Sequence, residues 1–260
     1  MRERQEMADT RLSGFLYKVR GIQMTRIQGR IAILLFLLVI MNSGPSLAID
    51  LPNDALLMFG ESPPSMEVVS LRREFINSAV QETGSRELAA LAFLSKAWSF
   101  MELGQFTESM RQLNRAWLLA PESREVYRGF GANLGRSGRY DDSIRMYEKA
   151  RALGPVSAEL LSEFAEPYNA KADVSHGPDR DAYADKAILL SREALELNPK
   201  LGPAYFNWAM ALYYKTYYVE STLRVNRALA LDEDCVNEAF ARDLESRLIE
   251  QYQLRPDGEP

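Results

Sequence analysis

Two residue types are almost missing from this sequence of 260 residues. It contains one cysteine, Cys235, and one histidine, His176. A single cysteine excludes an intramolecular disulfide and a zinc site built from cysteines, and a single histidine excludes a multi-histidine metal site. A Ser-His-Asp or Cys-His catalytic arrangement would have to use His176. No Gly-rich phosphate loop, metalloprotease helix or nucleophile elbow is present. We therefore expect no enzyme, no cofactor and no bound metal.

An excess of basic residues is also missing. The sequence contains 31 Lys and Arg against 36 Asp and Glu, a formal net charge of −5. No overall positive field attracts nucleic acid, so we expect no nucleic-acid partner. Hydrophobic residues make up 47% and charged residues 26% of the chain. This balance is typical of a chain that folds around a core, and it excludes a wholly disordered protein.

The longest apolar run, Ile31–Met41, is too short for a membrane span, which needs about 20 such residues. Arg26 and Arg30 precede the run, and Ser46–Ala48 supplies small residues after it. A charged start, a short apolar centre and a small-x-small end are typical of a secretory signal peptide. We expect residues 1–48 to be a signal region that is cleaved after Ala48. The alternatives are an uncleaved anchor or a buried helix.

A start at Met24 would give a signal peptide of ordinary length, and we expect Met24 to be the true start. The mature chain from Ile49 would be an acidic, exported protein without a stable membrane anchor. Its predicted location is periplasmic or extracellular.

The sequence matches itself at a fixed offset. The first step is 34 residues, the second is 44 residues because the third unit carries an insertion, and the third step is again 34. The pairs at the first step are Gly104 and Gly138, Phe106 and Tyr140, Ala116 and Ala150, Leu119 and Leu153, and Pro121 and Pro155. Several coincident offsets make the repeat specific.

A period of about 34 residues with this layout of small, aromatic and proline residues resembles the tetratricopeptide repeat (TPR) family. The resemblance covers residues 90–235 as four units: 90–123, 124–157, 158–201 with the insertion, and 202–235. It implies an all-α, right-handed superhelical stack of helix hairpins. Residues 49–89 are predicted to be a leader and an N-terminal helix over Met66–Gln81, and 236–260 a C-terminal capping helix and tail.

Small residues recur where the first and second helix of each unit should cross. Close approach of two helices requires small side chains at the crossing, and all eight equivalent positions have them. The first helices supply Ala97, Gly131, Ala165 and Ala209, and the second helices supply Ser109, Ser143, Ala187 and Ser221.

Two segments are expected to lack regular structure. Residues 49–62 read as a loose leader, and the inserted residues around 171–181 read as an exposed, turn-forming loop. His176 lies beside Asp173, Asp179 and Asp181 in this segment, which is a weak metal-ligand pattern. The composition of a turn-forming loop explains the same residues without a metal.

In the family that the repeat resembles, the concave surface lined by the first helices commonly binds a peptide or protein segment. The resemblance places seven candidate binding residues on this surface: Trp98, Arg128, Arg136, Phe206, Met210, Tyr213 and Tyr214. Two alternatives stay open. The terminal helices could cover the aromatic side chains, and the two arginines could pair with Glu125 or Glu159.

These observations predict a non-catalytic scaffold that binds another exported or envelope protein, or a peptide segment of one. We expect aromatic anchors at Tyr213 and Tyr214 and an acidic group of the partner near Arg128 and Arg136. The alternative is a groove for a small ligand, a glycan or a short peptide.

The predicted signal region can be tested directly. N-terminal sequencing of the mature protein should begin at Ile49, and Leu35→Arg should keep the protein in the cytoplasm, because the apolar run is too short to tolerate a charge. A mature protein that begins at Met1 or Met24 would contradict the cleavage.

Overall fold

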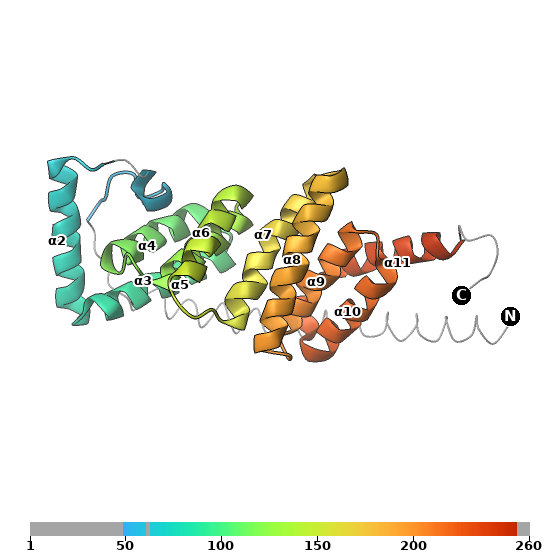
Figure 1. The fold of residues 1–260 in the computed structure, drawn as a ribbon. Helices are drawn as coiled ribbons and strands as arrows, with labels where there is room; N and C mark the ends of the chain where they lie inside the picture. Colours follow the sequence, from blue (N-terminus) through green and yellow to red (C-terminus); the bar gives the residue numbers. More distant parts are fainter. Residues whose placement is uncertain (1–48, 61–62, 254–260) are drawn as a thin grey trace.

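The structure, a computed structural model, describes residues 49–60 and 63–253. This part of the chain forms ten α-helices and two short 3-10 helices, without a strand. The helices follow one another as hairpins from α2 at one end of an elongated molecule to α11 at the other (Figure 1). The predicted all-α stack of helix hairpins is therefore confirmed.

Four hairpins form the stack, and single helices flank it on both sides. The bounds are η1 Leu57–Gly60, α2 Met66–Thr83, α3 Arg86–Glu102, α4 Phe106–Leu119, α5 Arg124–Arg136, α6 Tyr140–Ala152, α7 Ala158–Val174, α8 Gly177–Leu197, α9 Gly202–Tyr214, α10 Tyr218–Leu231, η2 Glu233–Cys235 and α11 Glu238–Gln253. The hairpins are α3 with α4, α5 with α6, α7 with α8, and α9 with α10.

The predicted signal region, its cleavage site after Ala48 and the start at Met24 lie outside the described residues. Among the helices of residues 49–60 and 63–253, none combines the length and the apolar composition that crossing a membrane requires.

The eight small residues of the repeat are buried where the two helices of each hairpin cross. The serines also fix the crossing by hydrogen bonds, because Ser143 Oγ donates to the carbonyl oxygen of Gly131 at 2.7 Å. Ser221 Oγ donates in the same way to Ala209 at 2.7 Å. A side chain at Gly131 would place its Cβ 2.8 Å from the ring of Tyr147, so only glycine fits there.

The turns within three hairpins share one geometry. The second residue after the first helix has a positive φ, and its N–H donates to the carbonyl three residues earlier. Glycine occupies this position in the first two turns, as Gly104 (φ 70°) and Gly138 (φ 83°). Thr216 occupies it in the fourth hairpin with φ 64°, although a β-branched residue is disfavoured in this region.

The expected loop in the third unit is wrong. Helix α7 continues to Val174 and α8 begins at Gly177, so the insertion lengthens both helices and Ser175 and His176 alone separate them. Buried Ala172 and Ala184 add apolar contacts to the longer helices, and Pro178 is tolerated because it stands in the first turn of α8. Helical packing thus overrides a composition that is typical of turns.

The candidate metal ligands in this segment do not converge. His176 Nδ1 lies 3.4 Å from a guanidinium nitrogen of Arg180. Among the residues that the structure describes, no three His, Cys, Asp or Glu side chains are grouped as metal ligands would be.

The expectation of a loose leader is also wrong for residues 49–60. Leu57 and Phe59 are buried in the core beside α2 and α4. Asp54 accepts a hydrogen bond from Arg111 Nε at 3.0 Å, and Asn114 Nδ2 donates to the Asp54 carbonyl at 2.7 Å. The sequence pattern hides this contact because the leader is irregular and its partners lie about 60 residues later.

Ala209→Leu should destabilise the protein by about 1–3 kcal/mol, because the crossing of α9 and α10 has no room for a larger side chain. Ala230→Leu on the exposed side of α10 is the matched control and should have little effect. Urea unfolding monitored by circular dichroism measures both. Equal stability of the two variants would contradict the crossing.

Candidate functional site

The first helices of the hairpins, α3, α5, α7 and α9, form one face of the stack, which we call the first-helix face. It corresponds to the surface on which the repeat predicts binding. The seven predicted residues lie on its helices in two groups. Trp98, Arg128 and Arg136 come from α3 and α5, and the four remaining residues come from α9: Phe206, Met210, Tyr213 and Tyr214.

Arg128 is held by contacts with three helices. Its guanidinium donates to both carboxylate oxygens of Glu163 on α7, at 2.8 and 2.6 Å. It also pairs with Glu125 on its own helix at 3.2 Å and lies over the ring of Trp98 on α3, with 5.4 Å to the ring centroid. The hydrogen bonds to Glu163 raise the pKa of Arg128 above its ordinary value. The sequence indicates the pairing with Glu125, whereas it gives no sign of the pairing with Glu163.

Arg136 pairs with Glu102 of the preceding hairpin at 2.9 Å. Together, the two arginines and the carboxylates around them form a chain of charges across α3, α5 and α7. We call this set, together with Arg124, which pairs with Glu125 at 3.2 Å, the first-helix charge cluster: Glu102, Arg124, Glu125, Arg128, Arg136, Glu163 and Glu166. It contains four carboxylates and three guanidiniums, so carboxylates are in excess by one.

Glu166 differs from the other members of the cluster because it has neither a hydrogen bond nor a salt bridge within the described chain. Solvent reaches its side chain, but protein atoms surround it on several sides. This desolvation and the nearby charge of Glu163 raise its pKa to about 7, and Arg136 opposes the shift. Glu166 is thus the carboxylate of the cluster that forms no salt bridge with the described residues.

A pocket of about 180 Å³ lies beside Glu166, between α5, α6 and α7. Its wall includes the rings of Tyr140 and Tyr147 and the side chain of Arg136. Pro167 also lines it and stands inside α7. The pocket therefore combines aromatic residues with one carboxylate, Glu166, and one guanidinium, Arg136.

Helix α11 covers part of the second group. The ring of Phe240 on α11 lies 5.3 Å from that of Phe206 and 5.2 Å from that of Tyr213. The Tyr213 hydroxyl also donates a hydrogen bond to Asp243. Tyr214 packs against the core between the third and fourth hairpins. Met210 is half-buried. The binding role of all four residues stays a prediction.

Several other positions on the first helices are buried between hairpins. Leu94 and Met101 belong to the core. Asn207 Nδ2 donates to the carbonyl oxygen of Ser162 at 2.9 Å, and Asn169 Nδ2 donates to that of Asn207 at 2.9 Å. This buried network joins α7 to α9. Its asparagines fix how the third and fourth hairpins stack, so they cannot also bind a partner.

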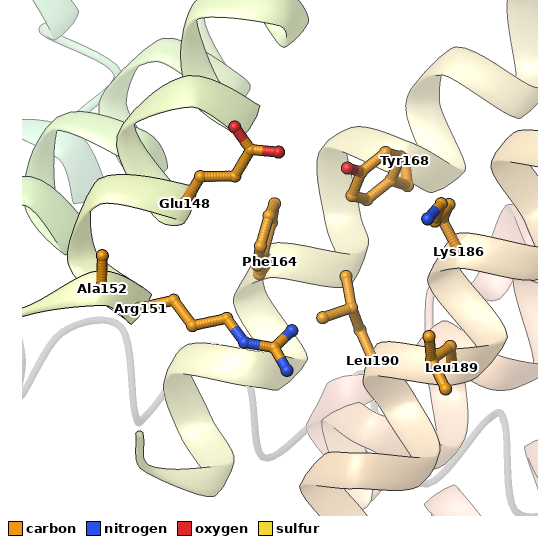
Figure 2. A pocket seen from close by; sticks show the side chains of 8 residues that line it. All are labelled: Glu148, Arg151, Ala152, Phe164, Tyr168, Lys186, Leu189 and Leu190. Carbon is orange, nitrogen blue, oxygen red and sulfur yellow. The ribbon is translucent and has the colours of Figure 1, made fainter. Parts of the chain in front are cut away.

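A second pocket, of about 380 Å³, lies away from the first-helix charge cluster, between α6, α7 and α8. Figure 2 shows Phe164 and Tyr168 of α7 beside Leu190, with Glu148, Arg151 and Lys186 around them. Arg151 is paired with Glu193 at 2.9 Å. The pocket has an apolar floor and a rim of mixed charge.

Solved structures share this arrangement of hairpins. The thermophilic TPR protein TTC0263 of Thermus thermophilus matches with a TM-score of 0.52 and 17% identity, over 63% of this chain and 81% of that protein. This chain has the TPR fold. Yeast Tom70 matches with a TM-score of 0.51 and 16% identity, over 76% of this chain and 46% of Tom70.

A third TPR-fold match comes from the APC/C hetero-tetramer Cut9–Hcn1, with a TM-score of 0.51, 16% identity, and coverage of 70% of this chain and 32% of the other. This chain spans less than half of the Tom70 and Cut9–Hcn1 chains that it matches. No family model and no curated protein matches its sequence.

Glu166→Gln should raise the melting temperature at pH 8 and change it little at pH 5. The folded protein raises the pKa of Glu166 above the unfolded value, so the ionised carboxylate destabilises the fold above pH 7, and this effect disappears as the pH falls toward 4.5. Differential scanning fluorimetry at both pH values measures it.

Two variants serve as controls. Glu148→Gln, at an exposed carboxylate of the pocket in Figure 2, is the matched control for the loss of a surface charge. Glu163→Gln should lower stability by about 1–3 kcal/mol, because it removes the paired charge of Arg128. A lower melting temperature of Glu166→Gln at pH 8 would contradict the assignment.

Proposed function

We propose that this TPR protein is an exported, non-catalytic scaffold that binds a segment of another protein along its first-helix face. The observation that carries the proposal is that each of the four first helices has at least one half-buried or exposed side chain at this face. These side chains include Trp98, Arg128, Arg136, Glu166 and Met210. A stacked repeat offers such a surface without any dedicated catalytic group, and its specificity depends on the side chains that project from it.

One similar structure supports this use of the fold. The Cut9–Hcn1 structure is a hetero-tetramer, in which a chain with this fold assembles with a different chain. By analogy of fold, we propose that the partner here is a protein or a peptide segment of one.

The chemistry of the two rare residues favours a non-catalytic role. Burial raises the pKa of the Cys235 thiol to about 12, which is opposite to the shift that a nucleophilic cysteine needs. His176 is exposed at the start of α8, where its Nδ1 lies 3.4 Å from a guanidinium nitrogen of Arg180. Neither residue lies at the first-helix face.

Export is proposed from the sequence of residues 1–48. The short apolar run between arginines and small residues supports a cleaved signal peptide, and the partner would then be an exported or envelope protein.

A second candidate function is binding of a small apolar ligand, a glycan or a short peptide. The pocket in Figure 2 favours it, because its volume of about 380 Å³ and aromatic floor are within the range of ligand sites. This pocket lies among α6, α7 and α8, so variants can separate the two candidates.

The test is capture of partners from native envelope extract by the parent protein and by Trp98→Ala/Met210→Ala, with mass spectrometry. Truncating two anchors should weaken binding by about 2 kcal/mol or more, roughly 30-fold, so a partner captured by the parent should be lost. Leu223→Ala, at an exposed site on α10, is the matched control and should retain it. Equal capture by all three proteins would contradict the first-helix face as the binding surface.

A further inference from the structure

In the first-helix charge cluster, the side chain without a salt bridge to the described residues is a carboxylate, Glu166. Arg128 and Arg136 are each already paired with carboxylates, at 2.6 Å to Glu163 and 2.9 Å to Glu102. An acidic group of a partner would have to displace one of these carboxylates and would meet the others at close range. The acidic group that the sequence suggests for the partner is therefore disfavoured by the charges around the arginines.

Glu166 offers the opposite kind of contact. Its carboxylate is accessible and has no hydrogen-bond or salt-bridge partner in the described chain. Arg128 and Arg136 form their salt bridges with other carboxylates of the first-helix charge cluster. A carboxylate in such surroundings gains most from a cation, because the cation both pairs with it and offsets the repulsion from Glu163.

The pocket beside Glu166 has walls that suit a cation on a side chain. The half-buried Tyr140 lines it, and aromatic rings attract ammonium and guanidinium groups. Arg136 also lines it, but the guanidinium of Arg136 is already paired with Glu102 at 2.9 Å. At about 180 Å³, the pocket accommodates the end of one side chain rather than a larger ligand.

We propose that the partner segment is basic and that one of its lysine or arginine side chains binds in the pocket beside Glu166. This inference rests on the proposed function and specifies the chemistry of its partner. The segment would lie across α5 and α7, with Trp98 on the side of α3 and Met210 on the side of α9. Charge complementarity would favour its approach, since four of the seven charges in the cluster are carboxylates.

The test uses a library of random 12-residue peptides displayed on phage, selected against the full chain at pH 8. The enriched peptides are then synthesised, and their affinities are measured by fluorescence anisotropy for the parent, Glu166→Gln and Glu74→Gln, an exposed carboxylate on α2. We expect the enriched peptides to share a lysine or arginine. Their affinity should fall at least tenfold for Glu166→Gln and should stay unchanged for Glu74→Gln. Replacing the shared cation by norleucine should cause the same loss.

Two results would overturn the inference, and they are distinguishable. Enriched peptides that are acidic or neutral, and whose binding is lost in Trp98→Ala/Met210→Ala, would refute the basic partner and leave the proposed function standing. Enriched peptides whose affinity is changed neither by Glu166→Gln nor by Trp98→Ala/Met210→Ala would refute the first-helix face as the binding surface as well.

Discussion

The close approach of the two helices in each hairpin is the constraint on which the rest of the structure depends. It holds because alanine, glycine and serine occupy every crossing, and because Ser143 and Ser221 bond directly to the backbone of the facing helix. With the two helices this close, larger side chains are displaced to the outer sides of each hairpin. There they pack against the next hairpin or reach solvent, so the crossings determine both the stack and its surfaces.

Polar groups then determine how neighbouring hairpins align. A buried amide such as Asn207 loses free energy unless its hydrogen bonds are satisfied, so its bonds to Ser162 and Asn169 select one register between α7 and α9. The pairs of Arg128 with Glu163 and of Arg136 with Glu102 join successive first helices in the same way at the solvent-accessible side. The surface charges are therefore already organised before any partner arrives.

The repeat itself could be predicted from sequence, because small and apolar residues at a constant spacing report directly on helix crossings. Contacts that have no periodic signal could not be predicted. Asp54, which binds Arg111, lies in an irregular segment. Glu163 binds Arg128 across two hairpins, and no spacing in the sequence indicates this pair. The insertion near His176 has a local composition that favours turns, whereas the packing of Ala172 and Ala184 favours helix.

The candidate site was predicted only in part for the same reason. Position in the repeat places Trp98, Arg128 and Arg136 on the correct helices, but it carries no information on which charges neutralise one another. The availability of Glu166 depends on distances between three hairpins, and the cover over Tyr213 depends on how α11 packs against α9. Both are properties of the assembled stack.

Thr216 makes the two ends of the stack unequal. At Gly104 and Gly138 the backbone enters the left-handed region without a side-chain clash, whereas a residue with a Cβ costs about 1–2 kcal/mol there. The last hairpin is thus closed by its turn less firmly than the first two, and η2 and α11 add the contacts beyond it. Packing of α9 against α7 and α8 therefore has to hold this hairpin in place where its turn does not.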